Sequence, residues 1–212
     1  MKNAEVKIFV CVQAALYLAF ETMDIMHIPG SAPVKFSGIV LCFAFSAYLS
    51  IRGGDKAVTW AIGFSMLADV LLLLYDGCYA VGIGLFCLAQ TAYFLRIYRA
   101  NGGKGAFPAR AIVFAAALMA LAALDMAQPL NILAVFYFSF FLCNTVQSFG
   151  AKNGLFSLGL CLFICCDVCV GLHNLPITGL VGELADVGMW TFYLPSQVLI
   201  TLSGRRNDEK AS

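Results

Sequence analysis

The sequence predicts an all-α integral membrane protein, a bundle of eight transmembrane helices with both termini on the cytoplasmic side. Three observations favour this class: the scarcity of charge, a regular succession of apolar segments, and a one-sided distribution of Lys and Arg. Only 12% of the 212 residues are charged and 61% are hydrophobic, whereas about a quarter of a soluble domain is charged. The mean hydropathy is +0.87. A net charge of +1 leaves no basic surface for nucleic acid, so no such partner is expected.

Eight apolar segments follow one another, each close to the roughly 20 residues that a membrane-spanning helix needs. They cover approximately residues 6–26, 34–51, 57–75, 79–98, 111–127, 130–149, 154–172 and 180–202. The connections are short and rich in turn-forming residues, as in Pro29-Gly30-Ser31 and Lys152-Asn153-Gly154, which favours tight turns. No connection is long enough for a soluble domain, so we expect a single transmembrane domain over residues 1–212.

The basic residues predict the orientation, because Lys and Arg near helix ends stay preferentially on the cytoplasmic side. With the N-terminus inside, twelve of the thirteen fall on that side: Lys2, Lys7, Arg52, Lys56, Arg96, Arg99, Lys104, Arg110, Lys152, Arg205, Arg206 and Lys210. The exception is Lys35, at the outer start of the second segment. We therefore expect a multi-pass membrane protein, in the cell membrane if the source is bacterial.

The cysteines and histidines argue against a metal centre or cofactor. Eight of the nine cysteines lie inside apolar segments and are interpreted as small hydrophobic residues. A redox or metal role for Cys165, Cys166 and Cys169 is the alternative. The only histidines, His27 and His173, are too few for a three-histidine zinc site, so no metal and no cofactor are predicted.

Two aspartates lie deep within predicted helices, where charge is expensive and therefore suggests function. Asp69 and Asp167 lie 12 and 13 positions into their segments, about 18–20 Å from the inner ends. The runs Gly63–Val70 and Cys161–Val168 both close on Asp-Val, four helices apart. This similarity predicts a parallel four-helix repeat that brings the two aspartates to one site. A structural hydrogen bond to a neighbouring helix is the alternative for each.

Other polar residues recur at helical spacing, which is typical of helices that line a cavity. One stripe lies in the first segment, another in the last, and shorter ones lie in the fourth and sixth: Gln13, Tyr17, Glu21 and Asp24; Glu183, Asp186, Trp190, Tyr193 and Gln197; Gln90 and Tyr93; Tyr137 and Asn144. An interhelical hydrogen bond that fixes packing is the alternative for any single Gln or Asn.

At these residues the sequence resembles the YhhN-like membrane family, which includes the lysoplasmalogenases. The similarity rests on Lys35, on GFSMLADVLLLL (63–74), on GIGLFCLAQTAYF (82–94), and on LCLFICCDVCVGL (160–172) with YLPSQVLITLS (193–203). The resemblance implies an eight-helix enzyme that hydrolyses the vinyl-ether bond of a lysoplasmalogen. The products are a fatty aldehyde and glycerophosphoethanolamine or glycerophosphocholine.

The resemblance carries Asp69 and Asp167 over as the catalytic pair, and Lys35 as a site residue. Two departures stand out: Phe36 follows Lys35 where the family usually has Pro, and Gln90 stands where the family often has His. The candidate substrate-binding residues are Lys35, Glu21, Gln90, Tyr93, Asn144, Glu183, Asp186, Tyr193 and Gln197.

Vinyl-ether hydrolysis suits two carboxyls, because one must stay protonated as an acid while the other stays ionised, as in glycosidases with their oxocarbenium-like transition state. Lys35 would meet the lipid phosphate as a point charge. Snorkelling is the alternative, and Glu21 or Glu183 is the expected local partner.

The competing function is a parallel-repeat transporter or lipid-binding protein. A serine protease is not favoured, since the sequence has no G-x-S-x-G elbow.

Overall fold

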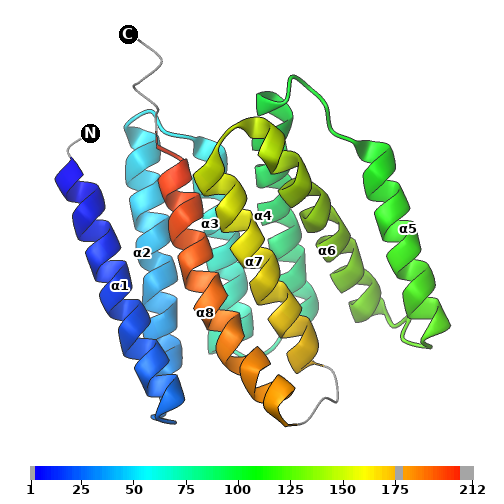
Figure 1. The fold of residues 1–212 in the computed structure, drawn as a ribbon, viewed down its shortest axis with the longest axis horizontal. Helices are drawn as coiled ribbons and strands as arrows, with labels where there is room; N and C mark the ends of the chain where they lie inside the picture. The colour runs from blue at the N-terminus through cyan, green and yellow to red at the C-terminus, as the bar shows by residue number, and fades with distance from the viewer. Residues whose placement is uncertain (1–2, 175–178, 206–212) are drawn as a thin grey trace. The chain divides into compact units, whose positions relative to one another are not determined.

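The computed structural model describes residues 3–174 and 179–205, and all regular structure in these ranges is helical (Figure 1). The helices are α1 (Asn3–Ile25), α2 (Ser31–Ile51), α3 (Lys56–Asp69), η1 (Val70–Leu74), α4 (Tyr79–Ala100), α5 (Phe107–Ala123), α6 (Pro129–Ser148), η2 (Phe149–Ala151), α7 (Gly154–His173) and α8 (Leu180–Ser203). The segment η1 is a π-helix that continues α3, and η2 is a 3₁₀ turn that continues α6. The predicted all-α class is confirmed.

Six of these helices are long and apolar enough to cross a membrane: Ala4–Ile25, Ser31–Ile51, Lys56–Leu74, Tyr79–Ala100, Pro129–Ala151 and Gly154–His173. The helix Phe107–Ala123 is apolar but shorter. These helices identify a membrane-spanning α-helical protein. A count of eight spans, with both termini cytoplasmic, stays a prediction.

The fifth helix begins about four residues earlier than predicted. It covers Phe107–Ala123 rather than 111–127. Ala106, at the N-cap, adopts a left-handed backbone with φ 44, and Pro108 lies in the first turn, where its fixed φ and missing N–H suit a helix start. The predicted segment began at residue 111 and left Arg110 outside the helix. The helix includes Arg110 because its side chain is buried and finds partners within the protein.

The chain forms two compact units. The first comprises Met1–Thr59 with Leu155–Ser212, and the second comprises Trp60–Gly154. The first therefore holds α1, α2, α7 and α8, and the second holds η1, α4, α5, α6 and most of α3. This division does not follow the boundary between the two predicted four-helix repeats, and the repeat stays a prediction.

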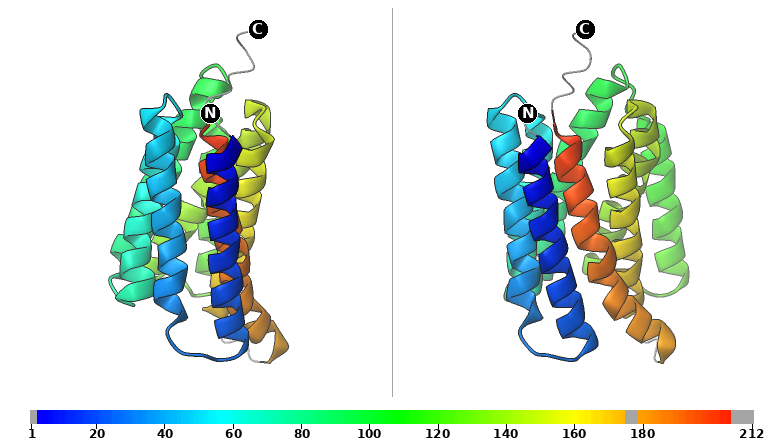
Figure 2. Two further views of the ribbon diagram at one scale, coloured as in Figure 1. Left: turned by 90° about the vertical axis from the view of Figure 1, so that its left-hand side faces the viewer. Right: turned by 60° about the vertical axis from the view of Figure 1, so that its left-hand side comes forward.

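In the first unit α1 and α2 form an antiparallel pair that lies side by side in both views of Figure 2, and α8 packs against both. Gly38 permits close approach of α2 and α8, because a Cβ there would lie 2.9 Å from Leu194 Cδ1. Gly159 does the same for α7 and α8, since its Cβ would lie 2.7 Å from Ile200 Cγ1. Small residues at such positions are typical of helix packing in membranes.

In the second unit α4 packs against η1 and α6, and α5 packs against α6. Gly82 brings α4 against η1, because its Cβ would lie 2.7 Å from the Leu72 side chain. Phe94 of α4 contacts Phe107 and Phe140, with ring centroids 5.5 and 5.6 Å away. These edge-to-face contacts join three helices near one end of the unit.

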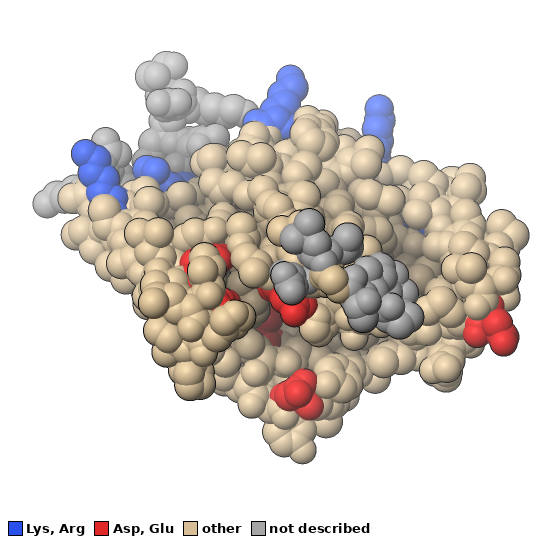
Figure 3. Space-filling view, turned by 60° about the horizontal axis from the view of Figure 1, so that its bottom comes forward, with Lys and Arg blue, Asp and Glu red and all other residues tan. Residues whose placement is uncertain are grey.

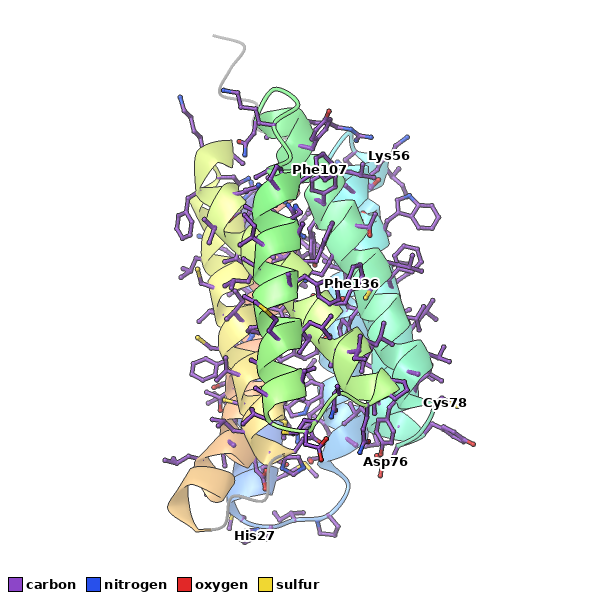
Figure 4. The ribbon with its side chains drawn as sticks, turned by 90° about the vertical axis from the view of Figure 1, so that its right-hand side faces the viewer. His27, Lys56, Asp76, Cys78, Phe107 and Phe136 are labelled. Carbon is purple, nitrogen blue, oxygen red and sulfur yellow. The ribbon has the colours of Figure 1, made fainter. Side chains whose placement is uncertain are left out.

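Charge is distributed along the helices as the sequence predicts. Figure 4 shows Lys56 at one end of the α3–η1 helix, and Asp76, just beyond it, at the other. On the face of Figure 3 that comes forward, acidic side chains are visible, while Lys and Arg project along the far edge. The orientation of these ends, with the acidic ends outside, stays a prediction.

Candidate functional site

Asp69 is the last residue of α3, and the helix changes to a π-helix at the next residue, Val70. Its side chain is buried, with an exposed fraction of 5%. It lies thirteen positions after Lys56, about 20 Å along the helix, close to the predicted depth. π-helical turns are rare and occur frequently at functional sites. Asp69 therefore combines two features of a functional position, a buried carboxyl and an irregular helix.

Asp167 lies on α7, thirteen positions after Gly154, and α7 continues as a regular α-helix to His173. Its side chain is partly buried. The position along α7 matches that of Asp69 along α3. The local geometry differs, however, because only α3 becomes π-helical after its aspartate.

Lys35 lies in a cluster where α1 ends and α2 begins. Its Nζ lies 2.6 Å from Asp24 Oδ2, 5.9 Å from the ring centroid of Phe20 and 5.4 Å from that of Trp190. Only 12% of the Lys35 side chain is exposed. The ammonium therefore has an anionic partner and two aromatic faces, which favour a cation, and it does not snorkel to solvent.

The partner of Lys35 corrects one expectation. The sequence favoured Glu21 or Glu183, but the ion pair is made by Asp24, one helical turn beyond Glu21. Glu21 instead accepts a hydrogen bond of 2.9 Å from Thr191 Oγ1. The side chain of Glu183 lies outside the described part of the chain. The stripe on α1 already contained Asp24, so spacing could have found it.

An aromatic series continues from this cluster along α8. The Trp190 ring lies 6.0 Å from Phe20 and 5.2 Å from Tyr193, and Tyr193 lies 5.3 Å from Phe163 of α7. One turn further, Gln197 is fully buried, and neither atom of its amide has a hydrogen-bond partner among the described residues. Trp190, Tyr193 and Gln197 thus lie on one face of α8, and the cavity that the stripe was predicted to line stays a prediction.

The side chain of Asp186 does not interact with these residues of α8 in the described structure. Its carboxylate forms an ion pair with the His173 imidazole at the end of α7, and both side chains are exposed. Asp186 was predicted to contact substrate. In the structure it joins the end of α7 to the start of α8.

In the second unit, Gln90 and Asn144 belong to a buried network that contains Arg110. Asn144 Nδ2 donates to Gln90 Oε1 at 2.9 Å, and Arg110 Nη2 donates to Asn144 Oδ1 and Gln147 Oε1, both at 2.9 Å. Gln90 and Asn144 are fully buried, and Arg110 is 6% exposed. Tyr93, one turn from Gln90 on α4, is fully buried as well.

Arg110 is the residue that the sequence analysis missed. Its Nε and Nη1 donate to the carbonyls of Gly105 and Phe140, each at 3.0 Å, and its guanidinium lies over the rings of Phe94 and Phe140, 4.7 and 4.3 Å from the centroids. A signal was available, since Phe140, Asn144 and Gln147 recur at spacings of four and three on α6 and form one face.

No group of three or more His, Cys, Asp or Glu side chains able to hold a metal occurs among the described residues. Each unit contains an aspartate within a long apolar helix and several buried polar side chains. The class is a membrane-spanning α-helical protein.

Residues 31–204 match the model of the YhhN family. The match covers well over half of the chain and includes Lys35, Asp69 and Asp167, so the chain belongs to the YhhN family, as the motifs predicted. No curated protein and no solved structure matches the chain significantly.

Proposed function

We propose that this chain is a membrane hydrolase that cleaves the vinyl-ether bond of lysoplasmalogens, releasing a fatty aldehyde and a glycerophospholipid headgroup. The observation that carries the proposal is the family match over residues 31–204, which contains both intramembrane aspartates. Their equivalent positions, thirteen residues into α3 and α7, support a shared role in catalysis.

The proposed mechanism needs one acid and one base. A protonated carboxyl donates its proton to the vinyl carbon β to the ether oxygen, which generates an oxocarbenium ion. The ionised carboxylate stabilises this cation and takes a proton from the attacking water, as paired carboxylates do in glycoside hydrolysis. The resulting hemiacetal collapses to aldehyde and alcohol. We assign these two roles to Asp69 and Asp167, and the reaction requires no metal or cofactor.

The Lys35 cluster is proposed to bind the lipid headgroup. Lys35 supplies a positive charge for the phosphate, although its pairing with Asp24 at 2.6 Å means that the phosphate would share this ammonium. Glu21, fixed by Thr191, supplies a carboxylate for the ammonium group of ethanolamine or choline. The net charge of Lys35, Asp24 and Glu21 together is −1, which suits a zwitterionic headgroup better than an anionic one.

The test compares lysoplasmalogen with its saturated alkyl-ether analogue, using protein purified in detergent. We expect aldehyde from the vinyl ether alone, because only the vinyl carbon can accept the proton. Asp69→Asn and Asp167→Asn should each abolish aldehyde release while the thermal unfolding midpoint stays within a few degrees of wild type. Turnover retained in both variants contradicts the mechanism.

One observation favours a second candidate function, proton-coupled transport or lipid binding. Transporter sites are often built on interrupted helices, and two helices here are irregular: α3 becomes π-helical after Asp69, and α8 contains Pro195. Uptake into proteoliposomes that follows a proton gradient, without aldehyde product, distinguishes this function from hydrolysis.

A further inference from the structure

Arg110 determines the direction of a chain of hydrogen bonds in the second unit. A guanidinium has only donors, so the atom of Asn144 that faces Arg110 Nη2 at 2.9 Å must be the oxygen Oδ1. The nitrogen Nδ2 of the same amide therefore faces away from Arg110. The orientation of the Asn144 amide follows from the chemistry of Arg110.

The same logic passes from Asn144 to Gln90. Asn144 Nδ2 donates to the backbone carbonyl and to the side-chain Oε1 of Gln90, both at 2.9 Å. Because a donor faces it, the atom of the Gln90 amide on that side must be the oxygen, and Nε2 must point away. Gln90 Nε2 is buried and has no hydrogen-bond partner among the described residues.

A buried amide donor without an acceptor is unfavourable, and native proteins satisfy nearly all such groups. Gln90 Nε2 is also held in one orientation, because Asn144 links the Gln90 amide to the buried guanidinium of Arg110. A network used only for packing needs no such donor. An apolar side chain at position 90 would keep the hydrogen bond from Asn144 Nδ2 to the backbone carbonyl of residue 90.

We propose that Gln90 Nε2 is a preset hydrogen-bond donor for an oxygen that enters the protein interior with the reaction. This inference rests on the proposed hydrolysis, which brings in such oxygens from two sources, the ether lipid and the attacking water. Both accept an N–H bond through a lone pair. Asn144 and Arg110 are positioning residues that act through Gln90.

The first test pairs two identical substitutions in the same network, Gln90→Met and Gln147→Met. Both remove one amide and nearly conserve volume, but Gln147 lies on the other branch from Arg110. The dissociation constant is measured with the saturated alkyl-ether analogue, and kcat with lysoplasmalogen. We expect Gln90→Met either to raise the Kd or to lower the kcat by about 10- to 100-fold. Both constants of Gln147→Met should stay within about twofold of wild type.

The two constants identify the source of the oxygen. A weaker Kd for the analogue indicates a lipid oxygen, whereas a lower kcat with an unchanged Kd indicates the attacking water. If Gln90→Met leaves both constants equal to those of Gln147→Met, the proposal is wrong.

The second test reverses the donor. Asn144→Asp and Gln147→Glu both place a carboxylate on Arg110, but the first also removes Asn144 Nδ2, which donates to Gln90 Oε1. The Gln90 amide then turns its Nε2 toward the introduced carboxylate and presents Oε1 instead. We expect Asn144→Asp to lose function as Gln90→Met does, and Gln147→Glu to retain it. Equal activity in the two carboxylate variants, with folding verified by thermal unfolding, contradicts a directional role.

These outcomes are separate from failure of the proposed function. If the wild-type protein binds the analogue but releases no aldehyde from lysoplasmalogen, the proposed hydrolase is refuted. The Kd of Gln90→Met for the analogue then tests whether Gln90 donates to a lipid oxygen. A wild-type hydrolase whose Gln90→Met variant is unchanged refutes only the donor.

Discussion

Replacing Arg110 with Lys should destabilise the protein, although the charge is kept. The Arg110 guanidinium uses three nitrogens to reach four acceptors: two carbonyls and the side chains of Asn144 and Gln147. A lysine has one nitrogen on a flexible stem and cannot reproduce this planar arrangement. We expect about two of the four acceptors to lose their partner.

The size of the effect follows from these bonds. A hydrogen bond to a charged group contributes about 1.5–3 kcal/mol, and two of the four bonds are only part-buried, so the lower end applies. Losing two bonds should lower the free energy of unfolding by about 3 kcal/mol. For a chain of this length, this corresponds to a fall in Tm of about 6–12 °C.

The assay is thermal unfolding in detergent, followed by intrinsic fluorescence or circular dichroism. Arg52→Lys is the matched control, because Arg52 is exposed and contacts only the Tyr48 ring at 4.9 Å among its described side-chain neighbours. The control should shift Tm by less than about 2 °C. If Arg110→Lys shifts Tm no more than Arg52→Lys does, Arg110 does not hold α5 against α6.

Three further predictions concern the first unit and its helix packing. Gly159→Ala should lower Tm, because the new Cβ would lie 2.7 Å from Ile200 Cγ1 and overpacking costs about 1–3 kcal/mol; Gly84→Ala, with no atom within 4 Å of its Cβ, should not. Lys35→Met should raise KM for lysoplasmalogen by about tenfold with little change in kcat, and an unchanged KM would remove Lys35 from the headgroup site. His173→Asn should leave Tm unchanged within error, since exposed ion pairs contribute about 0–1 kcal/mol, and a large fall would contradict this.

The helices and their approximate ends were predictable because apolar length and turn residues determine them locally. The fifth helix shows where this reasoning fails. The predicted segment began at residue 111, so Arg110 fell in the connection before it. In the structure its acceptors come from Phe140, Asn144 and Gln147 on α6, which lie 30 to 37 positions away, beyond the reach of a local pattern.

The candidate site was predictable to a similar extent. On α8 only Tyr193 and Gln197 among the described residues of the predicted stripe are buried, whereas Asp186 is exposed. Lys35 has its partner within the protein. The identity of its partner was wrong, because helical spacing places Glu21 and Asp24 on one face without choosing between them. The π-helix that follows Asp69 had no signal at all: the Val70–Leu74 run is apolar and unbroken, and nothing in it distinguishes a π-turn from an α-turn.

The positive-inside rule concerns basic side chains at helix ends that meet water, and Arg110 and Lys35 instead find their partners within the protein. Both lie near helix ends, and both are buried against two aromatic rings with oxygen acceptors within 3.0 Å. The Arg52 guanidinium lies over the Tyr48 ring but has no such acceptor in the described structure, and its side chain is exposed. A long cationic side chain leaves the interface only where preformed acceptors replace its water. In this protein, a basic residue near a helix end is therefore a guide to topology when its side chain meets water. When its side chain binds distant segments of the chain, it is a candidate functional residue.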